Sequence, residues 1–311
     1  EAKTITITWL IKTKLISICC KASKTAKTKT TIFTILAINT QPRILFARAE
    51  FKTSLSTNLP NKAPANKIIT QAISLGIKSK NFSSITLITA RCKESAASII
   101  KIPVLLQLFK SVERGQVHLY DQLPLTEYFR SEGSGSLQFK AENSMYTLDT
   151  LARLMITESD NSATNMLMSK IGSMVNVNQG IRDWGLNQTQ VKTWLPDLTG
   201  NNYTTAKDMA TMLYNIDNPK FLTESSRNKI IDYMSHVKNN RLIQAGLGEG
   251  ASFLHKTGDI GKMLGDAGMV TTPNGNKYIV VILANRPYNS PEGKEFIIKA
   301  SEIIYNYMVV K

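Results

Sequence analysis

Residues 95–106 read SAASIIKIPVLL, and this stretch decides how the rest of the chain is interpreted. Apolar residues recur at helical spacing between Ser98 and Leu123, with Gly115 as a stop signal, which predicts a helix beginning near Ser98. Ser98 and Lys101 share one face of that helix because they are three residues apart. A serine hydroxyl is a weak nucleophile, and a neighbouring lysine amine can accept its proton if burial and nearby cations lower the lysine pKa. Ser98 and Lys101 are therefore candidates for a serine nucleophile and its lysine base.

Two further motifs follow in order, Ser159-Asp160-Asn161 and Lys256-Thr257-Gly258. On its own the S-x-x-K spacing is a weak signal, since residues 226–229 and 235–238 share it. Each exact tripeptide is expected by chance in roughly one chain in twenty-five of this length, but their joint, ordered occurrence is far more specific. A helix-capping role for residues 159–161 is the lesser interpretation, because they lie within an apolar helical run.

The residues of the three motifs have different predicted roles in an acyl-transfer reaction. Ser159 can relay a proton to a leaving nitrogen, and Asn161 can hydrogen-bond a substrate amide. Lys256 is expected to supply fixed positive charge for a substrate carboxylate. The backbone N–H groups of Ser98 and Asp259 are candidates for an oxyanion hole. The predicted substrate-binding residues are Asn161, Thr257, Gly258 and Asp259.

The hydrophobic pattern changes near residue 250 and predicts a helical block followed by a sheet. Helices are expected over residues 147–171, 176–184, 205–214 and 223–237. Strands are expected over residues 252–259, 264–272 and 277–285, the last two joined by a hairpin turn at 273–275. Ser290 and Pro291 open a final helix as N-cap and first-turn proline. The fold class is therefore α+β, with a helical part at about 98–240 and a sheet part at about 250–311.

The chain resembles the class A β-lactamase and penicillin-binding-protein superfamily through the three motifs and their surroundings, GSGSLQF (133–139), LMITESDNSATNML (154–167) and HKTGDIG (255–261). The resemblance covers residues 94–311 and implies an antiparallel sheet flanked by helices, with an all-helical domain inserted and the site in the cleft between them. It implies the catalytic and binding roles given above. It also implies a small-molecule β-lactam or a peptidoglycan stem peptide as partner, a monomer, and a periplasmic or secreted location.

Residues 194–200, WLPDLTG, depart from that resemblance. The family carries a Trp-Glu-Pro-x-Leu-Asn loop whose Glu and Asn hold the water that hydrolyses the acyl-enzyme. Here the glutamate position is Leu195 and the asparagine position is Thr199, and losing a well-placed general base costs about 10²–10⁴-fold in rate. Asp197 is the nearest substitute base, and the competing interpretation is that it structures the loop. We therefore expect slow deacylation.

The composition breaks at residue 93. The first 93 residues hold 16 Lys and Arg against two acidic residues, Glu1 and Glu50, and so account for nearly all of the formal net charge of +15. They also contain all three cysteines, a single glycine and no aspartate. Residues 70–92 offer two apolar runs but no clear hairpin, so the sheet's N-terminal strands are doubtful. Residues 1–93 are interpreted as a divergent, disordered or misjoined region, for instance an out-of-frame translation.

Several function classes are disfavoured. The N-terminal lysines accompany no folded nucleic-acid-binding motif, so we expect no nucleic-acid partner. No apolar run is long enough for a stable membrane span, and three scattered His and three Cys predict neither metal nor cofactor. The leading hypothesis is a β-lactam hydrolase forming an acyl-enzyme on Ser98. The alternatives are a D-Ala-D-Ala peptidase or transpeptidase, a non-turnover β-lactam or peptidoglycan binder, and a misjoined inactive chain.

Overall fold

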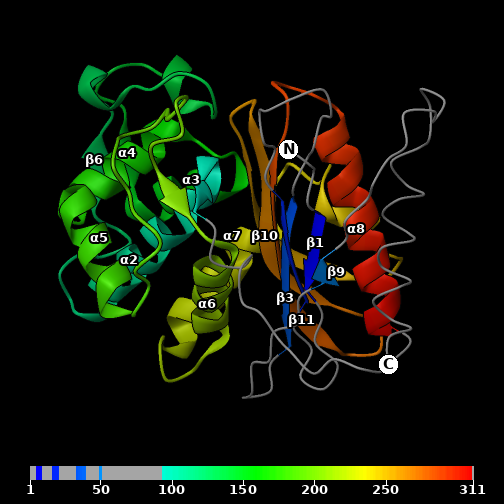
Figure 1. The fold of residues 1–311 in the computed structure, drawn as a ribbon. Helices are drawn as coiled ribbons and strands as arrows, with labels where there is room; N and C mark the ends of the chain where they lie inside the picture. The colour runs from blue at the N-terminus through cyan, green and yellow to red at the C-terminus, as the bar shows by residue number, and fades with distance from the viewer. Residues whose placement is uncertain (1–4, 9–15, 21–32, 40–48, 51–92, 310–311) are drawn as a thin grey trace.

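The computed structural model describes residues 93–309 and four earlier strand segments, 5–8, 16–20, 33–39 and 49–50. A seven-stranded antiparallel sheet has the order β4-β1-β2-β3-β11-β10-β9 (Figure 1). Helices pack on both of its faces, with α8 on one side and the helical part on the other. The predicted α+β class, an antiparallel sheet flanked by helices, is confirmed.

The bounds of the strands after residue 250 follow local sequence signals closely. Its strands are β1 (Ile5–Thr8), β2 (Ile16–Cys20), β3 (Phe33–Asn39), β4 (Ala49–Glu50), β9 (Ser252–Asp259), β10 (Met263–Thr271) and β11 (Lys277–Asn285). Two short pairs lie outside it, β5 (Glu94–Ser95) with β8 (Tyr203–Thr204) and β6 (Gln122–Pro124) with β7 (Met145–Thr147). The three strands predicted after residue 250 are confirmed to within one residue, because alternation and turn chemistry are local properties.

The sheet has N-terminal strands, which the sequence pattern left doubtful. Strand β3 pairs antiparallel with β11, with Ile35 opposite Ile282, and β2 pairs with β3 in turn. These segments are rich in Ile and Thr, which suit strands, and β3 covers an edge of β11 that would otherwise be open. The apolar runs of residues 70–92 lie outside the described residues. The out-of-frame origin of residues 1–93 stays a hypothesis.

The helical part contains six helices in residues 93–240. They are α2 (Lys101–Glu113), α3 (Leu148–Thr157), α4 (Asn161–Lys170), α5 (Ser173–Asp183), α6 (Ala206–Asp217) and α7 (Glu224–Ser235). Single 3₁₀ turns are η1 (Ala97–Ile100), η2 (Glu127–Phe129), η3 (Leu137–Phe139) and η4 (Ile243–Gly246). The last helix is α8 (Glu292–Val309). In the described part of the chain no helix is long and apolar enough to cross a membrane.

The single helix predicted over residues 147–171 is wrong. It is divided into α3 and α4, because Ser159 adopts a left-handed backbone with φ of 60° and Asp160 caps the second helix. The apolar positions continue across the break, since both helices bury one face in the same core. Periodicity alone therefore missed the interruption.

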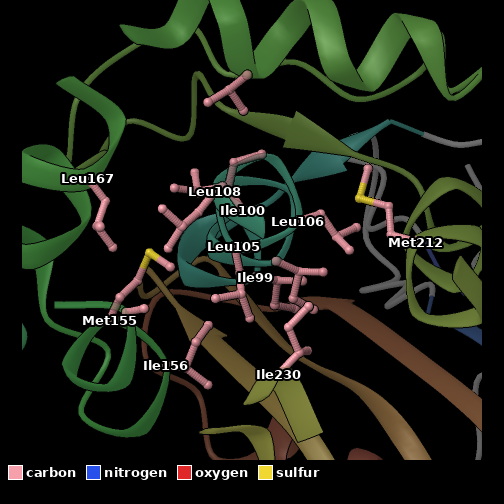
Figure 2. Close-up of a cluster of buried hydrophobic side chains, with 14 of the residues drawn as sticks. Ile99, Ile100, Leu105, Leu106, Leu108, Met155, Ile156, Leu167, Met212 and Ile230 are labelled. Atoms are coloured by element: carbon pink, nitrogen blue, oxygen red, sulfur yellow. The ribbon is translucent and has the colours of Figure 1, made fainter. Parts of the chain in front are cut away.

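Helix α2 is the centre of the helical part. Its side chains from Lys101 to Phe109 are all buried, and the surrounding apolar cluster draws on α3, α4, α6 and α7 (Figure 2). Strand β11 separates this core from a second one beneath α8: Ile279, Val281 and Leu283 point to the first, and Tyr278, Val280 and Ile282 to the second. The strand alternates between two apolar layers, as a fully covered strand should. This packing fixes the start of α2 against the sheet.

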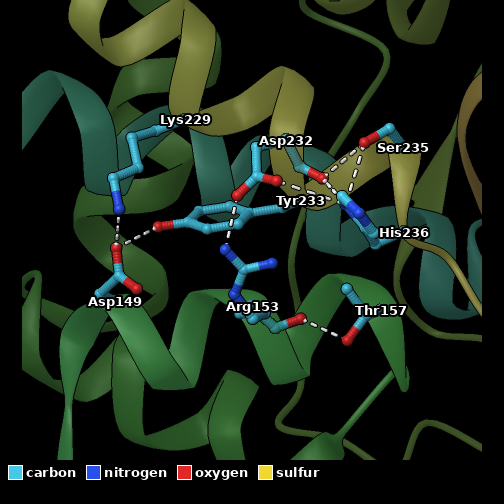
Figure 3. A network of polar contacts seen from close by, with 8 residues as sticks. All are labelled: Asp149, Arg153, Thr157, Lys229, Asp232, Tyr233, Ser235 and His236. Carbon is cyan, nitrogen blue, oxygen red and sulfur yellow. Dashed lines mark hydrogen bonds and ion pairs between the residues drawn. The ribbon is translucent and has the colours of Figure 1, made fainter.

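A polar network joins α3 to α7 on the surface of the helical part (Figure 3). Asp149 Oδ1 accepts hydrogen bonds from Lys229 Nζ at 2.6 Å and from the Tyr233 hydroxyl at 2.8 Å. Arg153 Nη2 pairs with Asp232 at 2.5 Å. The Tyr233 ring is fully buried while its hydroxyl reaches this network, so one residue links the core to the ion pairs.

Candidate active site

Ser98 and Lys101 meet at the junction of η1 and α2. Ser98 lies in the 3₁₀ turn, and Lys101 is the first residue of α2. The Lys101 side chain has no exposed surface, and its Nζ donates a hydrogen bond to Ser98 Oγ over 3.0 Å. The predicted shared face of the two residues is therefore observed.

The Lys101 amine is held by acceptors from the α3–α4 junction. Its Nζ donates to the Ser159 carbonyl oxygen at 2.5 Å, to Ser159 Oγ at 3.1 Å and to Asn161 Oδ1 at 2.8 Å. Burial lowers the pKa of Lys101 well below its ordinary value, the Lys256 charge lowers it further, and Asp160 acts in the opposite direction. A lysine in these surroundings can exist as a neutral amine, which is the form that accepts a proton.

The Ser159-Asp160-Asn161 motif has both a capping and a site role. Asp160 Oδ1 accepts a hydrogen bond from the Ala163 N–H and Oδ2 accepts one from the Leu137 N–H, each at 2.8 Å. The capping interpretation, ranked lower from sequence, therefore holds for Asp160. The left-handed φ of Ser159 turns the chain so that Ser159 and Asn161 both reach Lys101.

The glycines of GSGSLQF allow their loop to pack against this motif. The Asn161 N–H donates to the Ser134 carbonyl oxygen over 3.0 Å. Gly135 has a φ of 98°, and a Cβ there would lie 2.2 Å from Asp160 Oδ2. Only glycine satisfies both the backbone angle and the contact.

The Lys256-Thr257-Gly258 motif lies on β9, the edge strand of the sheet. Lys256 has no exposed surface, and its Nζ donates to the Thr257 carbonyl oxygen at 2.7 Å. Burial lowers the pKa of Lys256 to about 7, while Asp266 opposes the shift. The role of Lys256 as a positive charge for a substrate carboxylate stays a prediction, and the lowered pKa makes its protonation sensitive to pH near neutrality. A Cβ on Gly258 would lie 3.1 Å from the Ile99 nitrogen, so glycine lets β9 approach η1.

These elements enclose a cleft of about 490 Å³ between the helical part and the sheet. Of the predicted site residues, Ser98, Ser159, Lys256, Thr257, Gly258 and Asp259 line it. Lys101 and Asn161 lie directly behind Ser98 and Ser159. Eight of the nine predicted site residues thus come together, and the ninth, Asp197, is not among the lining residues.

Asp197 is engaged by its own loop. Its Oδ1 accepts hydrogen bonds from the N–H groups of Gly200 and Asn201, each at 2.9 Å, and its Oδ2 accepts one from the Asn202 N–H at 2.6 Å. The side chain is 4% exposed. This geometry favours the loop-structuring interpretation over the general-base interpretation.

Leu195 is buried in the apolar core of the helical part, at the position where the resemblance expects glutamate. Thr199, at the expected asparagine position, is exposed and hydrogen-bonds within the loop to Asp197 and Asn201. Neither side chain lines the cleft. A second cavity of about 440 Å³, lined in part by Trp194, Leu195 and Pro196, lies at this loop.

Sequence reasoning missed three charged residues of the cleft. Glu158, Lys238 and Arg241 all line it, and Lys238 Nζ pairs with Glu158 across 2.6 Å. No local pattern marks Lys238 or Arg241, whereas Glu158 directly precedes the Ser159 motif. Within residues 93–309, no group of three or more His, Cys, Asp or Glu side chains is placed to hold a metal ion.

Comparison with known proteins agrees with this geometry. The profile of the Beta-lactamase enzyme family matches residues 66–308. The chain belongs to the β-lactamase enzyme family. This family match crosses the composition break at residue 93 and includes every element of the cleft described above.

The β-lactamase-family chain is also similar to solved structures. PBP-A is 37% identical, with a TM-score of 0.72, over 82% of this chain and 100% of that chain. A Leu-to-Glu variant of PBP-A, solved as an acyl-enzyme complex with penicillin G, is 36% identical over 81% of this chain and 100% of that one, with the same TM-score of 0.72. A β-lactamase from Sphaerobacter thermophilus is 25% identical over 71% of this chain and 86% of that chain, with a TM-score of 0.65.

A curated β-lactamase from Bacillus licheniformis is 26% identical over 148 residues. The aligned part spans 45% of this chain and 48% of that relative. The chain thus matches about half the length of this relative, and its own activity and substrates are treated below as proposals.

Proposed function

We propose that this protein is a serine acyl-transfer enzyme that opens β-lactams through an acyl-enzyme on Ser98 and deacylates slowly. The observation that carries the proposal is the 3.0 Å contact between Ser98 Oγ and the buried Lys101 amine. A base must lie within hydrogen-bond reach of the proton it removes, and this pair meets that condition. A base must also be unprotonated to accept a proton, and the lowered pKa of Lys101 favours its neutral amine.

Acylation would run through the residues that line the cleft. The neutral Lys101 amine takes the Ser98 hydroxyl proton as Oγ bonds to the β-lactam carbonyl carbon. The N–H groups of Ser98 and Asp259 stabilise the oxyanion, and Ser159 passes a proton to the ring nitrogen as the amide C–N bond breaks. Asn161, Thr257 and Gly258 are proposed to contact the substrate, with Arg241 and protonated Lys256 attracting its carboxylate.

The 194–200 loop offers no evident base for deacylation. Leu195 has no titratable group, and the Asp197 carboxylate accepts three backbone hydrogen bonds inside its own loop. With neither loop residue acting as base, water attack on the ester is weakly assisted, which accounts for the expected slow step.

The peptidase alternative has specific support. The similarity to PBP-A, at 37% identity over 82% of this chain, exceeds the similarity to the β-lactamases given above. The same residues would then acylate Ser98 with a peptide ending in D-Ala-D-Ala and release D-alanine. A trap that binds β-lactams without turnover is the limiting case of slow deacylation. A location in the periplasm or outside the cell and a monomeric state belong to the same proposal.

Intact-mass spectrometry over time after mixing with penicillin G tests the proposal. We expect a mass gain equal to one penicillin on the wild type and none on Ser98→Ala. Ser235→Ala is the matched control, because Ser235 also precedes a lysine by three residues but lies outside the cleft lining. Slow decay with release of hydrolysed drug supports the hydrolase, and a persistent adduct supports the trap. Release of D-alanine from a D-Ala-D-Ala peptide supports the peptidase, and absence of any adduct contradicts the proposal.

A further inference from the structure

Asp259 lies directly after the Lys256-Thr257-Gly258 motif, and its carboxylate is held between two arginines. Oδ1 accepts hydrogen bonds from Arg286 Nη2 at 2.6 Å and from the Gly261 N–H at 2.9 Å. Oδ2 accepts one from Arg241 Nη2 at 3.0 Å. Asp259 and Arg241 both line the cleft that contains Ser98. An ion pair therefore occupies part of the wall of the candidate active site.

The two arginines are held very differently. Arg286 is 7% exposed and also donates to the carbonyl oxygens of Gly261 at 2.8 Å and Ser290 at 3.2 Å. The Arg241 side chain is 52% exposed, and Asp259 is its one ion-pair partner in the described part of the chain. Arg241 can therefore exchange its partner, while Asp259 stays bound to Arg286 and to the Gly261 N–H.

We infer that Asp259 acts as an internal competitor for a substrate carboxylate at Arg241, and so determines how strongly the site selects substrates carrying that group. The inference rests on the proposed function, since it concerns substrates that acylate Ser98. An incoming carboxylate meets an arginine that is already neutralised, with a like charge beside it. Binding requires the guanidinium to move from Asp259 to the substrate. Asp259 thereby reduces the gain in acylation rate that a substrate obtains from its carboxylate.

The opposite wall of the cleft provides a control of the same charge. Glu158 pairs with Lys238 at 2.6 Å and accepts a hydrogen bond from Ser136 Oγ at 2.8 Å. Lys238 and Arg241 come from the same segment after α7. Glu158 on one wall of the cleft pairs with Lys238, and Asp259 on the other wall pairs with Arg241. Removing the Glu158 charge changes the overall field of the cleft without releasing Arg241.

The test compares penicillin G with its methyl ester, which lacks the carboxylate. The measured quantity is the ratio of the second-order rate constants for acylation of Ser98, acid over ester, followed by intact mass. Asp259→Asn preserves the shape of the side chain and an oxygen acceptor for Gly261. We expect it to raise the ratio about threefold to fivefold, as release of a half-exposed ion pair allows. Glu158→Gln should change the ratio less than about twofold on the same grounds.

Arg241→Gln should lower the ratio, and adding Asp259→Asn to it should change nothing further. The inference is overturned if Asp259→Asn leaves the acid-over-ester ratio unchanged or lowers it. It is also overturned if Asp259→Asn raises the ratio by the same factor in the Arg241→Gln variant as in the wild type. An Arg241→Gln ratio equal to that of the wild type also overturns it, and does not depend on how Asp259→Asn folds. Failure of both compounds to acylate the wild type removes the proposed function and this inference together, whereas acylation with unchanged ratios removes the inference alone.

Discussion

Asn165 and Leu195 are joined by two hydrogen bonds that involve only the backbone of Leu195. The Leu195 N–H donates to Asn165 Oδ1 at 3.0 Å, and Asn165 Nδ2 donates to the Leu195 carbonyl oxygen at 2.8 Å. The Ser131 hydroxyl donates to the same carbonyl at 2.6 Å. The backbone at this position is thus held by contacts that do not depend on which side chain it carries.

Leu195→Glu should therefore place a carboxylate where the family's base is expected. We predict faster decay of the penicilloyl-enzyme, by up to about 10²–10⁴-fold for a well-placed base. We also predict a lower unfolding temperature, because the site is only 6% exposed. Time-resolved intact mass and thermal unfolding measure the two effects. Leu195→Gln is the control of similar shape, and equal decay in both variants would contradict a base role.

Asp197→Ala should destabilise the protein by about 1–3 kcal/mol, because three backbone N–H groups lose their acceptor. Urea unfolding measures this loss. If the loop role is correct, the decay of the acyl-enzyme should change by less than about tenfold, well short of the loss of a general base. A much larger loss of deacylation, with stability intact, would restore Asp197 as the base.

The pH dependence of acylation should follow Lys101. Because its pKa is lowered, the neutral amine persists to lower pH than in an ordinary lysine and is lost as the pH falls through that depressed value. Asn161→Asp replaces the amide oxygen 2.8 Å from Nζ with a carboxylate, which raises the lysine pKa. We expect the acylation profile to move to higher pH by about one unit or more. Asn161→Ser, without the charge, should not move it upward; an unshifted Asn161→Asp profile would argue against Lys101 as the base.

Lys256 should make stability rise with pH above neutrality. Its pKa is about 7 in the folded protein and 10.5 in its ordinary state, so between these values the unfolded chain binds a proton that the folded protein does not. Stability therefore increases with pH in this window, by at most about 1.4 kcal/mol per unit. Lys256→Met lacks this dependence. Urea unfolding at pH 7, 8.5 and 10 should show the stability advantage of the variant shrinking with pH, and a constant difference would refute the shift.

Tyr233→Phe tests the network between α3 and α7. It removes the hydroxyl that donates to Asp149 at 2.8 Å but leaves the ring in the core. The Lys229 pair with Asp149 at 2.6 Å remains. We expect a loss of about 0.5–1.5 kcal/mol in the free energy of unfolding. Chemical denaturation of the variant and the wild type measures it, and an unchanged midpoint would show that the hydroxyl adds nothing.

Local signals were sufficient for most of the secondary structure. The strand bounds at 252–259 and 277–285 follow from alternation and turn chemistry. The helix predicted from residue 205 is capped there, because Thr205 Oγ1 accepts a hydrogen bond from the Asp208 N–H. The helix predicted over residues 147–171 failed because its interruption depends on distant partners. Asp160 is held by the Leu137 N–H, and Ser159 contacts Lys101, 58 residues earlier.

The order and spacing of the three motifs, with the family resemblance that they carry, predicted from sequence alone that their side chains would meet, although the break in the helix at Ser159 depends on distant partners. Only the tertiary structure decided the surroundings of those side chains. The pKa of Lys101 and of Lys256 depends on burial between the two parts of the fold. The engagement of Asp197 by its own loop and the pairing of Asp259 with Arg241 depend on distances set by folding. Burial and charge separation are properties of the packed molecule, and spacing along the chain does not encode them.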